Sequence, residues 1–478
     1  MLSLESNDSS KSDTSLKSDF ISEGSYGCVY YPGINCKGKK NNKKMITKIQ
    51  EINFHSINEK DIGIYIKKNI KRYYKYFNPI QKFCIVKFNT IEKSHLDINK
   101  CDTLFDEYNS QKQSESGNSA IRDVVNEQYF LMYSAYIYNL TLIEFYGKYD
   151  GTNFVFSLLH TLAFLLNSLI ILQKYEICHN DLHENNILIN MKNYGPIIID
   201  FGLAFKKSSC YKLNKDYIDF QFLKKFVFDY RPEFYQFVIE KKFISFIIYN
   251  KTMHYPNEIY DNNERNILSK DAIALFIKDT CSNIRESPEI IKYITESEMT
   301  HYNAALEKFY YQFLNTEEFP DYNSIVAYLL DFVFIYTDLY SMCINVLHIR
   351  YKRDRYFASF EPYHDASSDD DIFLLHFFTQ LYKKVLYPDP NMRLQLSQVL
   401  DLYNYIISYI KKYDLKDSVK DSVKDSIKLD FVTSLIKFLK YKSIDIKTVF
   451  YKNFAFLNFN LLCTNNIFKA IQDSTIFY

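Results

Sequence analysis

Short stretches of alternating apolar and polar residues occur early in the chain, and longer stretches at helical spacing follow them. Met45–Ile49 alternates and predicts a strand, and the apolar run Glu127–Ser134 predicts a second one. Isoleucines at positions 57, 62, 66 and 70 predict one long helix over Ser56–Tyr76, with Ser56 and Glu59 placed as a capping box.

The apolar run Phe154–Leu172 carries no charge over nineteen residues and is long enough to cross a membrane. His160, Asn167 and several hydroxyl groups interrupt it, however, and it leads directly into a polar loop. We therefore interpret it as a buried core helix and predict no membrane span.

Several stretches stand apart from these elements. Residues 1–18, rich in Ser, Asp and Lys, predict a disordered tail, and the polar stretch Thr90–Asp123 predicts a disordered insertion. Residues 413–430 repeat the pattern KDSV and predict a solvated helical linker to a C-terminal helical extension at 431–478. Residues 234–322 alternate aromatic-rich and polar segments and predict extra helices.

The composition narrows the classes of function. At 478 residues and 47% hydrophobic content the chain can bury a core, and its net charge of +1 gives no electrostatic case for a specific nucleic acid. Its nine cysteines contain no C-x-x-C pair, so the sequence supports neither a zinc site nor a disulfide framework and favours a reducing compartment. Because no signal peptide is apparent, we expect a cytoplasmic and not a secreted protein.

The densest set of chemistry-bearing residues lies in ICHNDLHENN, residues 177–186, and in the Asp200-Phe201-Gly202 turn that follows an apolar stretch. The two motifs resemble the catalytic loop and the metal-binding turn of protein kinases. The resemblance implies that Asp181 is the general base that accepts the proton of the attacking hydroxyl. It also implies that Asn186 and Asp200 are the oxygen ligands of Mg²⁺.

Two upstream segments resemble the nucleotide-binding parts of the same family. ISEGSYGCVY, residues 21–30, resembles the Gly-rich loop over the ATP phosphates, with Ser22 where the first glycine usually stands. Lys48 matches the strand lysine that clamps the α- and β-phosphates, and Met132 lies near the hinge at Tyr133–Ala135. The resemblance thus implies an ATP-binding set that comprises Ile21, Gly24, Ser25, Tyr26, Gly27, Val29, Ile46, Lys48, Met132, Asn186 and Asp200.

Kinases pair the strand lysine with a helix acid. Glu59 and Asp61 are the two acids of the predicted helix, and Glu59 is also a candidate cap, so the sequence leaves the partner of Lys48 open. We include Glu59 in the ATP-binding set.

Two later motifs fit the same family. Thr337–Met342 resembles the region of the central helix whose Asp, here Asp338, anchors the backbone of the catalytic loop. Asp389–Arg393 resembles a late motif whose Arg pairs with a Glu, for which the sequence offers Glu233.

The motifs run in kinase order through residues 19–412. The resemblance implies an α+β, two-lobed protein-kinase-like fold with insertions: a small β-rich N-lobe with one main helix over about 19–135 (insertion 90–123), and a large, mostly helical C-lobe over about 136–412 (insertion 234–322). The chain has 43 Tyr, 40 Phe and no Trp, the bias of an AT-rich genome. With its H-N-D-L-H-x-N-N loop it resembles the Ser/Thr protein kinases of giant double-stranded DNA viruses, which implies the host cytoplasm or the virion.

We expect an ATP-dependent Ser/Thr protein kinase that acts on a protein substrate. His183, which the resemblance includes among the catalytic residues, stands where these kinases usually have Lys. Small-molecule phosphotransferases of the aminoglycoside or choline kinase type share this His and are the first alternative. A pseudokinase scaffold is the second alternative, because Ser22 and the open partner of Lys48 depart from the family pattern.

Asn180 occupies the position of the Arg in the kinase motif H-R-D. In kinases switched by phosphorylation that Arg helps to bind the phosphate. The segment after Gly202 still offers hydroxyl acceptors and local cations, namely Ser208, Ser209, Tyr211, Lys206 and Lys207. Because Asn180 is uncharged, we expect activity without phosphorylation of this segment.

Overall fold

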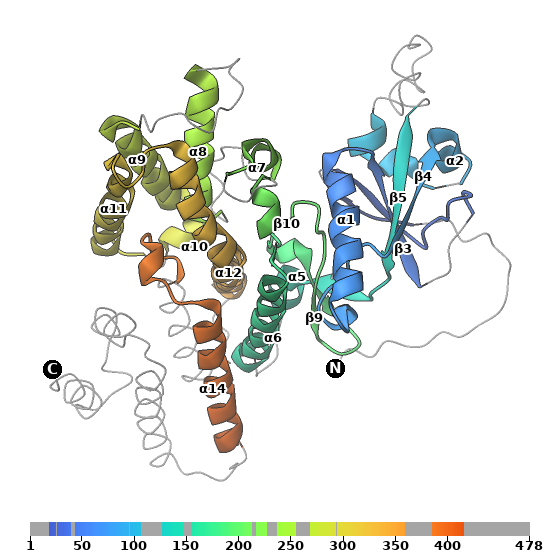
Figure 1. Cartoon of the computed structure of the whole chain (residues 1–478). Helices are drawn as coiled ribbons and strands as arrows, with labels where there is room; N and C mark the ends of the chain where they lie inside the picture. The colour runs from blue at the N-terminus through green and yellow to red at the C-terminus, as the bar shows by residue number, and fades with distance from the viewer. Residues whose placement is uncertain are drawn as a thin grey trace. The chain divides into compact units, whose positions relative to one another are not determined.

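A computed structural model (Figure 1) describes residues 19–24, 26–39, 44–94, 96–106, 127–147, 154–212, 217–226, 237–254, 268–292, 294–358 and 385–414. It has a five-stranded antiparallel sheet followed by a largely helical region, so the predicted α+β class is confirmed. The chain divides into two compact units. One comprises the residues up to Tyr73, Asn78–Ile137 and Asp200–Gly202, and the other comprises Tyr74–Phe77, Tyr138–Ile199 and the chain from Leu203 onward. The predicted tail 1–18 and extension 431–478 lie outside the described residues, as does the predicted linker beyond residue 414.

The first unit is built on the five-stranded sheet. Its strands, in spatial order, are β1 (Asp19–Gly24), β2 (Gly27–Tyr31), β3 (Met45–Glu51), β5 (Gln128–Ala135) and β4 (Lys82–Lys87). Strand register places Lys48 directly opposite both Val29 and Met132. Because successive side chains of a strand point to opposite faces, these residues and Ile46 share one face, and Cys28, Ile49 and other core residues lie on the other.

The face of the sheet that carries Cys28 and Ile49 packs against a segment that the sequence predicts to be disordered. It contains α2 (Phe88–Glu92), the 3₁₀ turn η2 (Ile98–Lys100) and a helical turn at residues 102–106. Ile91, Ile98 and Phe105 are buried in the same core as Ile49. The prediction of a disordered insertion is therefore wrong for residues 90–106, because apolar residues recur among the polar ones; residues 107–123 lie outside the described part of the chain.

Among the described residues, Cys28 of β2 forms a disulfide with Cys101 of this segment, and Cys36, in the loop after β2, forms one with Cys84 of β4. The expectation of no disulfide framework is wrong, because the paired cysteines lie 73 and 48 residues apart and leave no local spacing pattern. Since disulfides persist mainly in oxidising environments, the argument for a reducing compartment also loses its basis.

Helix α1 (Phe54–Asn69) begins and ends earlier than the sequence predicts. Asn53 is its N-cap, and the side chains of Asn53 and Ser56 each accept a hydrogen bond from the other's backbone N–H. The predicted capping box of Ser56 and Glu59 is therefore wrong. Gly63 lets the helix approach the chain closely, since a Cβ there would lie 2.7 Å from the carbonyl oxygen of Ile80.

The second unit contains two small sheets and many helices. The sheets are β6 (Asn139–Thr141), β8 (Ile187–Asn190) and β9 (Pro196–Ile198), and β7 (Ile177–Cys178) with β10 (Phe205–Lys206). The helices are α5 (Leu142–Gly147), α6 (Phe154–Lys174), α7 (Phe220–Phe226), α8 (Ile239–His254), α9 (Lys270–Glu286), α10 (Pro288–Ile291), α11 (Glu296–Tyr310), α12 (Tyr322–Ala358) and α14 (Leu396–Asp414). Short 3₁₀ turns are η3 (Glu184–Asn186), η4 (Lys207–Cys210), η5 (Tyr311–Leu314) and η6 (Pro390–Met392), and η1 (Tyr73–Lys75) lies where the chain passes between the units.

Within the described part of the chain, two helices are long and apolar enough to cross a membrane by length and composition alone. Their apolar windows are Ser157–Lys174 in α6 and Tyr322–Lys352 in α12, of which 56% and 61% is buried. Core helices of soluble proteins have the same character, and the absence of a membrane span stays a prediction.

A fully buried ion pair fixes the start of α8. Arg393 donates to both carboxylate oxygens of Glu240, at 2.8 and 2.9 Å, and both side chains are 0% exposed. The proposed pairing of Arg393 with Glu233 is therefore wrong. Glu233 lies outside the described residues, and the sequence around Glu240 gives no signal of its role.

Candidate active site

Lys48 lies between two carboxylates in the first unit. Its Nζ is 2.8 Å from Oε2 of Glu59 on α1 and 3.1 Å from Oδ2 of Asp200. Glu59 is thus the acid that pairs with Lys48, whereas Asp61 is exposed and contacts Lys60. Asp200, 152 residues after Lys48, thus meets the same ammonium group as Glu59, which lies only 11 residues after Lys48.

Burial and the neighbouring charges both shift the pKa values of Glu59 and Lys48. Burial raises the pKa of Glu59 to about 7, and the charge of Asp200 adds to this while that of Lys48 opposes it. Burial alone would lower the pKa of Lys48, but the two carboxylates outweigh it and raise that pKa. The Asp200 side chain is 40% exposed and that of Glu59 only 5%, so Asp200 is the carboxylate that a cation or phosphate-bound metal can reach.

The turn at Asp200 is held in a strained conformation. Asp200 has φ 58°, in the left-handed region that non-glycine residues seldom adopt, and its Oδ1 accepts a hydrogen bond from the backbone N–H of Gly202 at 3.2 Å. Asn58 on α1 donates to the carbonyl oxygen of Gly202 at 3.0 Å, and Phe201 is buried. Strain of this kind concentrates at functional sites. The sequence did not single out Asn58, although it directly precedes Glu59.

The predicted Gly-rich loop is the hairpin between β1 and β2. Gly24 pairs with Gly27 at its end, and an added Cβ at Gly27 would collide with the carbonyl oxygen of Ile49 on β3. Tyr26 stacks on His55 with ring centroids 4.4 Å apart, Ile21 is 47% exposed at a strand irregularity, and Ser25 lies outside the described residues. Gly27 is therefore required by packing on β3 as well as by any ligand.

In the second unit the loop between β7 and β8 carries Asp181, His183 and Asn186. The amide nitrogen of Asn186 donates to the backbone oxygen of Asp181 at 2.9 Å and to its Oδ2 at 3.2 Å. His183 Nε2 lies 3.8 Å from the same Oδ2, and His183 Nδ1 accepts from the backbone of Asn185. Since the Asn186 nitrogen binds Asp181, its oxygen is the end of the amide suited to a cation.

Helix α12 holds this loop through three side chains. Asp338 accepts hydrogen bonds from the backbone N–H groups of His179 and Asn180, at 2.8 and 2.9 Å, as the sequence predicts. Asn345 donates to the carbonyl oxygen of Leu182 at 2.9 Å, and His348 Nδ1 lies 2.9 Å from Glu184. Asn345 and His348 lie seven and ten residues after Asp338, a helical spacing that could have revealed them.

Each of the two units carries an oxygen donor of the type that a hard divalent cation binds. Asp200 offers an exposed carboxylate and Asn186 an amide oxygen, the ligand types that Mg²⁺ selects. Lys48 offers an ammonium to phosphate oxygens, and Asp181 a carboxylate that can accept a proton. These residues belong to two compact units, with Lys48, Glu59 and Asp200 in one and Asp181 and Asn186 in the other.

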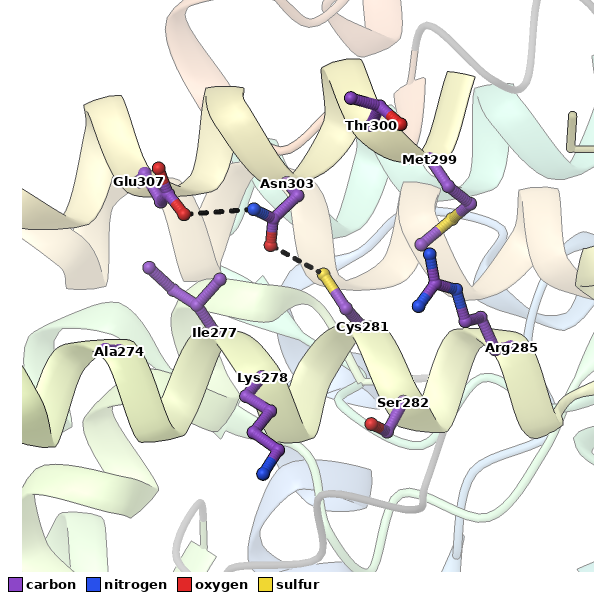
Figure 2. A pocket seen from close by; sticks show the side chains of 10 residues that line it. All are labelled: Ala274, Ile277, Lys278, Cys281, Ser282, Arg285, Met299, Thr300, Asn303 and Glu307. Atoms are coloured by element: carbon purple, nitrogen blue, oxygen red, sulfur yellow. Dashed lines mark hydrogen bonds between the residues drawn. The ribbon is translucent and has the colours of Figure 1, made fainter. Parts of the chain in front are cut away.

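Residues of α9 and α11 line a groove of about 480 Å³ (Figure 2). Cys281 donates to Asn303 at 3.4 Å, and Asn303 donates to Glu307 at 3.0 Å, so these polar side chains satisfy one another. Burial also raises the pKa of the Cys281 thiol to about 11, which makes it a poor nucleophile. The groove contains none of the predicted site residues.

No protein-family model matches this chain, and no curated protein matches it. Its function must therefore be argued from the residues and their geometry.

Proposed function

We propose that this chain is an ATP- and Mg²⁺-dependent Ser/Thr protein kinase with a two-lobed kinase-like fold, and that it is viral. The observation that carries the proposal is the ammonium of Lys48 between Glu59 and Asp200. A part-buried lysine shared by two carboxylates from different segments is an arrangement suited to binding a metal–polyphosphate complex.

Each group would act by position and charge. Lys48, oriented by Glu59, would bind phosphate oxygens, and Asp200 and Asn186 would hold Mg²⁺, which neutralises charge on the transferring phosphoryl group. Asp181 would accept the proton of a protein hydroxyl, and the amide of Asn186 would keep its carboxylate in place. His183 Nε2, 3.8 Å from Asp181, could interact with the same carboxylate.

His183 also favours a second candidate, a small-molecule phosphotransferase. Transfer from radiolabelled ATP onto a generic protein such as casein, run beside aminoglycoside and choline acceptors, separates the two. Label on protein alone supports the kinase, label on a small molecule alone supports the phosphotransferase, and no label on any acceptor favours the pseudokinase scaffold.

Two substitutions test the assigned roles. Asp181→Ala should lower turnover by roughly 10² to 10⁴ with near-normal ATP affinity, because a general base acts mainly in the transition state. Asp200→Ala should abolish metal-dependent nucleotide binding, measured by calorimetry with and without Mg²⁺. Unchanged turnover in both variants would remove the enzyme proposal.

A further inference from the structure

The residue before Asp181 is held in an unusual conformation. Asn180 has φ 65° and is 1% exposed. Few non-glycine residues adopt a left-handed conformation, and it persists only where surrounding contacts enforce it. The contacts of Asn180 therefore bear on how Asp181 is placed.

Three hydrogen bonds enforce this conformation. The backbone N–H of Asn180 donates to Asp338, and its side-chain nitrogen donates to the carbonyl oxygen of Leu203 at 3.0 Å. Its side-chain oxygen accepts from Nζ of Lys241 on α8 at 2.8 Å. Because Lys241 can only donate, it fixes which end of the amide faces Leu203.

Lys241 is itself held in place. It is 1% exposed, its Nζ lies 3.4 Å from the centroid of the Phe237 ring, and it follows Glu240, which Arg393 binds through two hydrogen bonds. A lysine is seldom buried to this degree, because moving an ammonium out of water costs free energy that its contacts must offset. The side chain is therefore pre-organised for its contact with Asn180.

We propose that Lys241 is a positioning residue for the Asp181 general base. Its ammonium orients Asn180, and Asn180 joins the loop that carries Asp181 to the segment after Gly202 through Leu203. A cation built into α8 thus supplies a permanent anchor at the residue next to Asp181, and no added phosphate is needed to provide one. The assignment of Asp181 as general base rests on the proposed function.

The contacts of the segment that follows Gly202 agree with this role of Lys241. Lys207, a candidate partner for a phosphate on Ser208 or Ser209, already contacts Asp331 at 2.7 Å. Strand β10 pairs with β7, which leads into the same loop. The segment after Gly202 is thus attached by contacts within the fold, at Leu203, at β10 and at Lys207.

The test compares Lys241→Met, Lys241→Arg and the control Lys242→Met in the full chain, since Lys242 is the next buried lysine of α8. Lys241→Met should lower kcat roughly 10- to 100-fold, since small displacements of a reacting group cost up to this much, and leave KM for ATP within about twofold. Lys241→Arg should recover most of kcat, and Lys242→Met should keep it. If Lys241→Met fails to fold, Lys241→Gln replaces it and should lower kcat in the same direction by a smaller factor, because Gln keeps a donor but is shorter and uncharged.

Amide hydrogen exchange gives a readout that does not need activity. Lys241→Met should speed exchange at the backbone N–H groups of His179 and Asn180 by at least tenfold, whereas Lys242→Met should not. Unchanged kcat with unchanged exchange in Lys241→Met would overturn the proposal, and so would equal losses in both methionine variants. If the wild-type chain transfers no phosphate, the proposed function fails, and the exchange rates alone then decide whether Lys241 positions the loop.

Discussion

The pKa of Glu59 gives the sharpest prediction about the site. Glu59 is buried and shares Lys48 with Asp200, so its carboxyl ionises near pH 7 and not near its usual 4.5. Only ionised Glu59 can hold Lys48 as an ion pair. We therefore expect kcat/KM for ATP, which reports the ionisation of the free enzyme, to fall as the pH drops through 7.

The size of the fall follows from the ionised fraction. With a pKa of about 7, Glu59 is about nine-tenths ionised at pH 8 and about one-tenth ionised at pH 6. The wild-type kcat/KM should thus be roughly tenfold lower at pH 6, which corresponds to about 1.4 kcal/mol. Glu59→Gln, which stays neutral, should already have the low kcat/KM at pH 8 and should lack the fall in kcat/KM between pH 8 and pH 6.

Rates of transfer from radiolabelled ATP between pH 5.5 and 8.5 measure the effect. Asp61→Asn is the matched control, because Asp61 is the exposed acid of the same helix and should leave the profile unchanged. The terminal phosphate of ATP also titrates in this range, but it affects all variants alike. The same acid limb in wild type and Glu59→Gln would refute the assignment of the limb to Glu59.

The stability of the fold should change with pH in the opposite sense to kcat/KM. A carboxyl whose pKa is raised by folding favours the folded state while it is neutral, so its contribution is complete below about pH 4.5 and is lost as the pH rises through about 7. The melting temperature of the wild type, relative to Glu59→Gln, should therefore fall between pH 5 and pH 8. A wild type that gains stability over Glu59→Gln in this range would contradict the raised pKa.

Three further outcomes are expected. Arg393→Met should lower the free energy of unfolding by about 3 to 5 kcal/mol in denaturant titrations, because it leaves Glu240 as a buried, unpaired charge; a loss below about 1 kcal/mol would contradict this. Phosphatase treatment combined with Ser208→Ala and Ser209→Ala should leave kcat within about tenfold, or 1.4 kcal/mol in the barrier, and a larger loss would show that the segment is switched by phosphorylation. Gly27→Ala should lower the melting temperature even without ATP, because its methyl group would collide with β3, and an unchanged value would show that only ligand contacts require this glycine.

The sequence marked the candidate site residues more readily than it marked their distant contact partners. Lys48, Asp181 and Asp338 stood out because each lies in a short motif with fixed spacing. Glu240 and Lys241 did not, because their partners lie 153 and 61 residues away in the chain and no local pattern marks a residue for such a contact.

The average composition gave a wrong prediction of disorder where a few buried residues determine the structure. Residues 90–106 look polar on average, but buried residues such as Ile91 and Phe105 are enough to fix them in the core. The boundaries of α1 were misplaced for a similar reason, since Asn53 competes with Ser56 as the cap and only the hydrogen bonds decide between them.

The attachment of α1 bears on how inhibitors could be chosen. The helix is held at three points along its length, by Asn58 to Gly202, by Glu59 to Lys48 and by the close packing of Gly63 on Ile80. A compound that had to push α1 aside would break the part-buried ion pair between Glu59 and Lys48, and this cost would lower its affinity. Compounds that leave α1 in place and occupy the face of the sheet beside Met132 are therefore the better starting scaffolds.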